Sequence, residues 1–163
     1  MWRGIEEHLG SEQVSRVIYG AIIGMALVVV LEHHPTSPAA TTATLFATAL
    51  AVALAELYSE VIGTTTRLRQ RIERHHLRHI LTDVGAVAFG ILFPDIFFLL
   101  ATFSLIELST AFSVAKWTGL GLIAFYGFCA GRLSGSSVAW SIAQALAVAL
   151  IGIALIGFKA LIH

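Results

Sequence analysis

The sequence predicts an all-α integral membrane protein with five transmembrane helices, and three observations lead to this class. Of its 163 residues, 57% are hydrophobic and 12% are charged, which is about half the charged fraction of a soluble domain. Five apolar runs are each long enough, at about 20 residues, to cross a bilayer as a helix. The densest cluster of charge lies in one short segment between the second and third runs. The chain is therefore expected to form a single membrane domain.

The five spans are expected to follow one another with short connections. The polar run Glu32-His33-His34-Pro35 ends the first span, and the second begins almost at once, so these two should form an antiparallel hairpin. Pro94 should kink or break the third span because proline has no backbone N–H and clashes with the preceding turn. A polar, serine-rich turn separates the fourth span from the fifth. The predicted spans are 14–31, 39–63, 80–103, 108–130 and 138–158.

The segment 64–79 between the second and third spans is read as a basic cytoplasmic linker. Basic residues near the ends of spans stay in the cytoplasm, and they attract anionic lipid headgroups. With five spans, this places the N-terminus in the cytoplasm and the C-terminus outside; a bacterial inner membrane is favoured over an organellar one. The formal net charge is zero, so no nucleic-acid partner is expected. The lipid-contacting residues of the linker are Arg67, Arg69, Arg71, Arg74 and Arg78.

An acidic stripe near the end of the second span is the sharpest sign of function. Glu56 and Glu60 are four residues apart and so share one helical face. A carboxylate within a span costs roughly 2–3 kcal/mol or more unless it faces protein, water or a cation. Glu56 is interpreted as a cation or proton site, or alternatively as a carboxyl hydrogen-bonded to a neighbouring helix. Glu60 is a second pathway candidate, or an interfacial residue that pairs with Arg67.

Other polar groups in the spans have two readings each. Asp95, directly after Pro94, either caps a broken helix or lines the pathway. Tyr58 is a candidate pathway residue, although tyrosines at such positions more often pack or lie at the interface. Glu107 and Lys116 are expected to form a structural ion pair.

Three adjacent potential metal ligands, Glu32, His33 and His34, lie at the outer end of the first span. They form a possible outer site for a divalent ion, although neighbouring residues on one helix diverge and cannot all reach a single ion. His75 and His79 have zinc-like i, i+4 spacing but are surrounded by arginines. No hydrolase, nucleotide-binding or redox motif is present, so the chain is not expected to be an enzyme or to carry a covalently bound cofactor.

Several short strings resemble the vacuolar iron transporter family. They match the start of that family's first span, its Gly-Glu-Tyr-x-Ser stretch, the glycine and proline at the end of its third span, and its connection between spans four and five. The strings are Val17-Ile18-Tyr19-Gly20 with Gly24, Ala55-Glu56-Leu57-Tyr58-Ser59, Phe89-Gly90-Ile91-Leu92-Phe93-Pro94, and Gly131-Arg132-Leu133-Ser134-Gly135.

The resemblance implies a homodimer that moves Fe²⁺ or Mn²⁺, with Gly20 and Gly24 packing the first spans at the subunit interface. It carries over one pathway residue, Glu56. The chain departs from the family at Ile23 and Val52, where the family has an aspartate and a methionine, and it lacks the Glu-rich cytoplasmic domain.

Three functions are therefore carried forward. The first is a transporter of a divalent cation (Fe²⁺, Mn²⁺ or Zn²⁺), coupled to protons if a carboxyl binds metal or proton but not both. The second is a channel for ions, protons or a small solute. The third is a non-transporting membrane scaffold that has lost the metal ligands.

Overall fold

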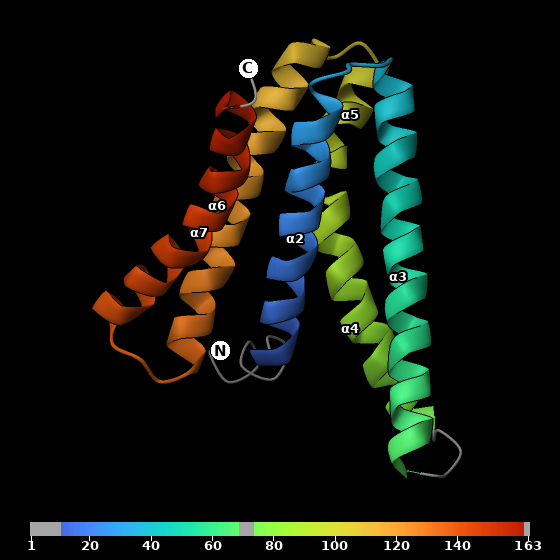
Figure 1. Cartoon of the computed structure of the whole chain (residues 1–163), viewed down its shortest axis with the longest axis vertical. Coiled ribbons are helices and arrows are strands. Elements are labelled where there is room, and N and C mark those ends of the chain that lie inside the picture. The colour runs from blue at the N-terminus through green and yellow to red at the C-terminus, as the bar shows by residue number, and fades with distance from the viewer. Residues whose placement is uncertain (1–10, 69–73, 162–163) are drawn as a thin grey trace.

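The computed structural model describes residues 11–68 and 74–161 and is helical throughout these ranges, with no strand. Its six helices are α2 (Ser11–Leu31), α3 (Pro38–Leu68), α4 (Arg74–Leu92), α5 (Asp95–Thr102), α6 (Leu108–Leu133) and α7 (Val138–Leu161). Figure 1 shows them as a bundle, with α2 in the middle, α3 at one edge and α7 at the other.

Three of the described helices are long and apolar enough to cross a membrane, over Gln13–Leu31, Pro38–Thr66 and Leu108–Leu133. The α4–α5 pair qualifies as a fourth span if the two helices, bent by 52° at their junction, are taken together. The described apolar part of α7, Val138–Ala154, is shorter than a span. These helices indicate an integral membrane protein with three or four spans in its described residues, where the sequence predicted five.

The predicted break at Pro94 is present, and the predicted linker is largely helical. Pro94 cannot donate a backbone hydrogen bond, so α4 ends at Leu92 and α5 begins at Asp95. At the linker, α3 continues to Leu68 and α4 begins at Arg74. Arg69 and Arg71 lie outside the described residues, as does the rest of 69–73.

The first two spans are antiparallel and joined by a short connection, as expected, but they scarcely pack against each other. Helices α2 and α3 make few contacts because α4 lies against both of them, while α5 packs against α3 and α6. Helix α2 packs mainly against α4 and α6, and α6 packs against α7 (Figure 1). Helix α3 is consequently an edge element, with 11% of its apolar stretch buried.

Gly20 and Gly24, which were expected at a subunit interface, pack against another helix of the same chain. A side chain on Gly20 would collide with the backbone of Val87, and a Cβ on Gly24 would lie 3.0 Å from the Ile91 Cα. From the other side, a Cβ on Gly90 would lie 2.5 Å from the Ala21 nitrogen. Small residues let helix backbones approach closely. Here they join α2 to α4, so α4 of the same chain covers this face of α2.

Candidate functional site

Four charged side chains from three helices meet at one end of the bundle, and we call them the Arg16 cluster: Arg16, Glu56, Glu60 and Asp83. The Arg16 guanidinium on α2 lies between the carboxylates. Its Nη1 is 3.3 Å from Glu56 Oε2 and its Nη2 is 3.7 Å from Glu60 Oε2, both on α3. Its Nε is 3.6 Å from Asp83 Oδ2 on α4. The acidic stripe of the second span therefore faces an arginine of the first.

Helix geometry explains how the sequence builds this cluster. Glu56 and Glu60 are one turn apart on α3, so both carboxylates reach the same partner. Because α2 and α3 scarcely touch, a long side chain is needed to join them, and arginine supplies five N–H donors in a fixed fork. Asp83 completes the contact from α4 and is the most buried member, with its side chain 6% exposed.

The Arg16 cluster has more negative than positive charge. Its three carboxylates face one guanidinium, which leaves two negative charges when all four groups are ionised. His79 Nδ1, one turn before Asp83, lies 3.3 Å from Asp83 Oδ2, but its side chain is 58% exposed and adds a positive charge only when protonated. The second oxygen of Asp83, Oδ1, is buried and has no hydrogen-bond partner.

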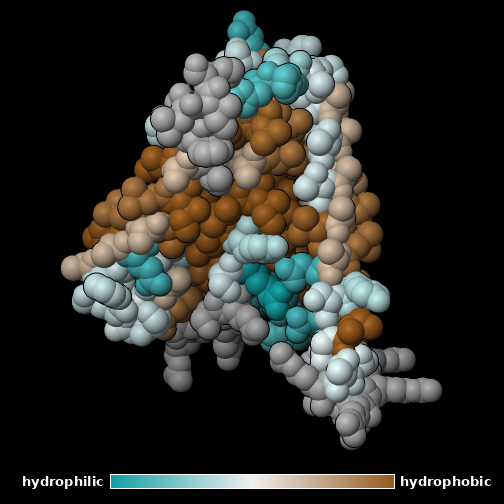
Figure 2. Space-filling model, viewed as in Figure 1, coloured by the Kyte–Doolittle hydropathy of each residue, from teal (hydrophilic) through white to brown (hydrophobic). Residues whose placement is uncertain are grey.

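The surface of this face has separate hydrophilic and hydrophobic areas. Figure 2 shows a hydrophilic area low on this face, between the lower parts of α2 and α3, below a broad hydrophobic band. The carboxylates at this end are partly accessible, with side-chain exposures of 25% for Glu56 and 42% for Glu60. An ion or proton from water can therefore reach Glu56 and Glu60 before the buried Asp83.

The opposite end of the bundle has a second, simpler ion pair. Lys116 Nζ on α6 donates to both oxygens of Glu32, at 2.7 and 2.9 Å. Lys116 thus pairs with Glu32 rather than with the expected Glu107, whose carboxylate instead accepts from the Ser109 hydroxyl. Glu32 was predicted as part of an outer metal site with His33 and His34. The lysine occupies that carboxylate, which counts against such a site.

The remaining predicted site residues are spread over the molecule. Asp95 is buried in the first turn of α5 and does not reach the Arg16 cluster. Tyr58 lies on the outer face of α3 with 70% of its surface exposed, so it does not join the two glutamates beside it. Arg78 is exposed on α4. Arg67 and Arg74 belong to helices, but their side chains are outside the described set.

No group of three or more His, Cys, Asp or Glu side chains within 11–68 and 74–161 is arranged to hold a metal ion. The three carboxylates of the Arg16 cluster point at the guanidinium instead. Arg16 thus occupies the place that a cation would take among them.

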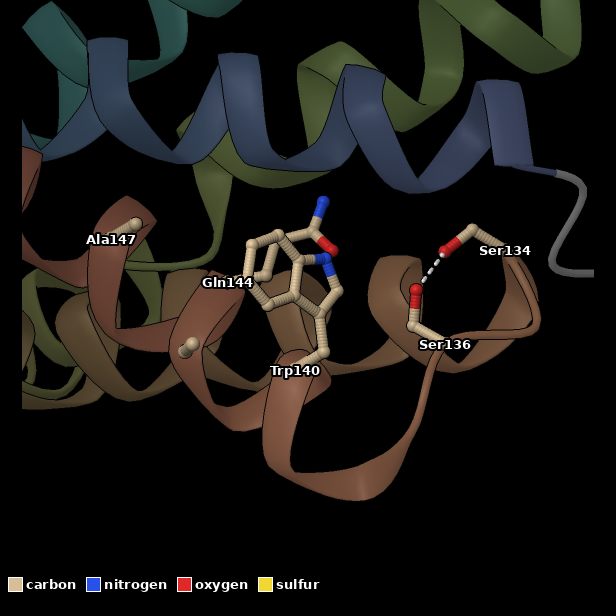
Figure 3. A pocket seen from close by; sticks show the side chains of 6 residues that line it. Ser134, Ser136, Trp140, Gln144 and Ala147 are labelled. Atoms are coloured by element: carbon tan, nitrogen blue, oxygen red, sulfur yellow. Dashed lines mark hydrogen bonds between the residues drawn. The ribbon is translucent and has the colours of Figure 1, made fainter.

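A separate open pocket of about 560 Å³ lies at the turn between α6 and α7. Figure 3 shows Trp140 and Gln144 on one side of α7, next to the hydrogen bond between Ser134 and Ser136. The Ser134 hydroxyl also donates to the Gly131 carbonyl. This pocket contains no charged side chain among its lining residues and is distinct from the Arg16 cluster.

Comparison of the chain with protein-family models, curated proteins and solved structures gives no match. The resemblance to vacuolar iron transporters stays a prediction from short strings of sequence.

Sequence reasoning found two of the three carboxylates of the cluster and missed Arg16 and Asp83 as site residues. Both residues could have been noticed from their positions in the sequence. Arg16 is a lone basic residue at the start of an apolar run, and Asp83 is an acid just inside another. Intramembrane ionisable residues face partners in the bundle, so Arg16 could have been paired with the three carboxylates because their charges are opposite.

Proposed function

We propose that the chain is a membrane transporter of divalent cations of the Fe²⁺ or Mn²⁺ type, and that the Arg16 cluster is its cation site. One observation carries this proposal. Three carboxylates surround a single arginine, with one oxygen of the buried Asp83 left without a partner. One divalent cation, or two protons, would balance the two surplus negative charges.

The chemistry of the cluster suits such a cargo. Carboxylate oxygens are the ligands preferred by hard and borderline divalent ions, and all three carboxylates are within 4 Å of Arg16. The contacts at 3.6 and 3.7 Å are longer than the roughly 2.7–2.9 Å of a strong charge-assisted hydrogen bond. A guanidinium held this loosely can be displaced. In this proposal the metal ion enters among the carboxylate oxygens and the tethered guanidinium moves aside but stays next to them, so that the two cations together balance the three negative charges.

Proton coupling follows from the same charge balance. A carboxylate must lose its proton before it binds a metal, so metal and protons compete for the cluster. An inward movement of one divalent cation would be accompanied by release of up to two protons. We retain five spans with a cytoplasmic N-terminus as part of this proposal, which places the Arg16 cluster at the cytoplasmic end, next to the basic linker.

The test is metal uptake into proteoliposomes, with and without a pH gradient. Glu56→Gln and Asp83→Asn should each lower Mn²⁺ uptake by at least about tenfold, because losing even a group that supports a metal ligand costs 10- to 100-fold in affinity. Glu107→Gln is the matched control, since it removes one exposed carboxylate outside the cluster. Uptake by Glu56→Gln equal to that of the unaltered chain would remove the site assignment.

A second candidate, a non-transporting membrane scaffold, is favoured by the same arginine. Arg16 already neutralises part of the cluster, and the described residues contain no ready metal-binding group. Under this alternative the ion pairs only fix α2, α3 and α4 together. Glu56→Gln would then lower stability while Mn²⁺ flux stays absent in every variant and in the unaltered chain.

A further inference from the structure

A second buried acidic site lies away from the Arg16 cluster, at the break between α4 and α5. Three side-chain oxygens of the described residues are buried without a hydrogen-bond partner, and Asp83 Oδ1 is one of them. The other two are Asp95 Oδ1 on α5 and Thr42 Oγ1 on α3. Asp95 is 5% exposed, and its carboxyl lies near the Thr42 side chain without a hydrogen bond between them. These two residues face each other across a helix–helix contact.

Apolar packing surrounds the pair. Phe98 is one turn beyond Asp95 on α5, and Leu45 is one turn beyond Thr42 on α3; both are fully buried in one hydrophobic cluster. An aromatic contact at 4.8 Å between ring centres joins Phe98 to Phe112 of α6. Water and ions therefore have little access to the carboxyl from this side.

The nearby charged groups are engaged elsewhere. On α6 the charged side chains are Lys116, which bonds Glu32 of α2, and Arg132 near the other end of the helix, which donates to the Ser136 carbonyl. On α4 the described ionisable side chains are the exposed Arg78 and His79 and the buried Asp83, which is twelve residues before Asp95 and directed at Arg16. On α3 the partner is Thr42, which is uncharged. A carboxylate at Asp95 would have no countercharge among these elements.

An isolated charge in an apolar region is so costly that the group takes up a proton or a cation instead. A hard divalent cation needs about six oxygen ligands, but this site offers two unpartnered side-chain oxygens. The Gly90 carbonyl, which loses its helical donor at Pro94, is not a third ligand, because it faces α2 at 3.3 Å from the Cβ position of Gly24. The geometry therefore favours a proton.

We propose that Asp95 and Thr42 form a proton-binding site at the break between α4 and α5. A neutral Asp95 donates its O–H to the Thr42 hydroxyl oxygen. When the proton leaves to water as H⁺, the carboxylate keeps the electron pair and the Thr42 O–H rotates to donate to it. A hydroxyl both donates and accepts, so one threonine serves both states; valine, which has the same shape, would serve neither.

In the transporter proposed above, on which this step rests, Asp95 holds a proton that is separate from those displaced by metal at the Arg16 cluster. Its release and uptake would couple the flux to a pH gradient. Asp95→Asn, which copies the neutral acid, should bind Mn²⁺ like the unaltered chain but show a weaker dependence of uptake on the gradient, because only the protons of the Arg16 cluster remain coupled.

Infrared difference spectroscopy tests the proton site without requiring any transport. The full chain is reconstituted in lipid vesicles without metal, and spectra are recorded as the pH is changed from acidic to alkaline. We expect a carboxylic-acid C=O band that Asp95→Asn removes, that Thr42→Val shifts, and that Thr44→Val leaves unchanged. Thr44 is the matched control because it is exposed on α3 and its hydroxyl bonds the Ala40 carbonyl.

Two results would overturn the proton site. One is a spectrum in which Asp95→Asn removes no band; the other is a band that Na⁺ abolishes at constant pH, which would show a cation site. If Asp95→Asn does not fold, the shift caused by Thr42→Val decides the same question. A chain with the expected band but no Mn²⁺ flux would contradict the transporter and leave the proton site standing.

Discussion

The two ends of the bundle hold their charges in different ways. At one end, Lys116 and Glu32 form a balanced pair, one positive and one negative group, with both contacts under 3 Å. At the other, Arg16 faces three carboxylates at 3.3–3.7 Å, and the charges do not balance. The two sites do not differ in the exposure of their cations, since the Arg16 and Lys116 side chains are each 19% exposed.

We interpret the Lys116–Glu32 pair as one that holds two helices together, and the Arg16 cluster as one that can exchange its partner. A short, balanced pair gains nothing from a further cation. A loose, unbalanced cluster has a free-energy reason to accept protons or a metal ion, because surplus like charges in partly buried surroundings repel one another. The following substitutions test the contrast, starting with the largest expected effect.

Arg16→Gln should cause the largest loss of stability. Removing one partner of a buried ion pair costs about 3–5 kcal/mol, and the partial exposure of this cluster places the expected loss near about 3 kcal/mol. The free energy of unfolding can be measured in mixed micelles by tryptophan fluorescence. Mn²⁺ at a hundred times its Kd should raise the free energy of unfolding of Arg16→Gln by about 2.7 kcal/mol, because the ion replaces the missing guanidinium.

Arg78→Gln is the matched control for this change, since Arg78 is an exposed arginine on α4. It should shift the unfolding free energy by no more than about 0.5 kcal/mol. Because Arg78→Gln keeps the Arg16 cluster intact, Mn²⁺ should stabilise it as well; if Mn²⁺ stabilises neither variant, the cluster is not a cation site.

Lys116→Met should cost about 2 kcal/mol, less than the Arg16 change, because it leaves one carboxylate rather than three without a countercharge. Adding Glu32→Gln should recover most of that loss, and a double-mutant cycle measures the coupling. Mn²⁺ should stabilise Lys116→Met by no more than it stabilises the unaltered chain, because the Arg16 cluster is intact in both. A larger gain in Lys116→Met would show that the Lys116 end also binds the ion and would contradict the distinction between the two ends.

Glu60→Gln should have the smallest effect, at most about 0.5 kcal/mol, because partly exposed ion pairs contribute little. Glu60 is the most exposed carboxylate of the cluster, 42%, and has its longest contact, 3.7 Å. The same unfolding assay checks it. A loss as large as that of Arg16→Gln would mean that Glu60, rather than Asp83, is the main anchor of the guanidinium.

Local features of the fold could be predicted from the sequence. Apolar length predicted three helices that are long enough to span a membrane, and a fourth if α4 and α5 are taken together. The missing N–H of Pro94 predicted the break between α4 and α5. The face shared by Glu56 and Glu60 also follows from helical spacing alone. Each of these properties depends on residues within a few turns of one another.

Contacts between distant segments could not be predicted in this way. Forty residues separate Arg16 from Glu56, and 84 separate Glu32 from Lys116. Their pairing depends on which helices are neighbours, and α2 and α3 make few contacts with each other because each packs against α4. Because the neighbours of each helix were not known from the sequence, Gly20 and Gly24 were assigned to an interface with a second subunit. In the structure, α4 of the same chain lies against that face.

The glycine contact between α2 and α4 bears on the geometry of the Arg16 cluster. A side chain at Gly20 or Gly90 would collide with the neighbouring backbone, so the close contact of α2 and α4 depends on these two positions staying glycine. Arg16 and Asp83 belong to this closely packed pair, whereas Glu56 and Glu60 belong to α3 at the edge. The distances within the Arg16 cluster therefore depend on where α3 lies relative to the α2–α4 pair.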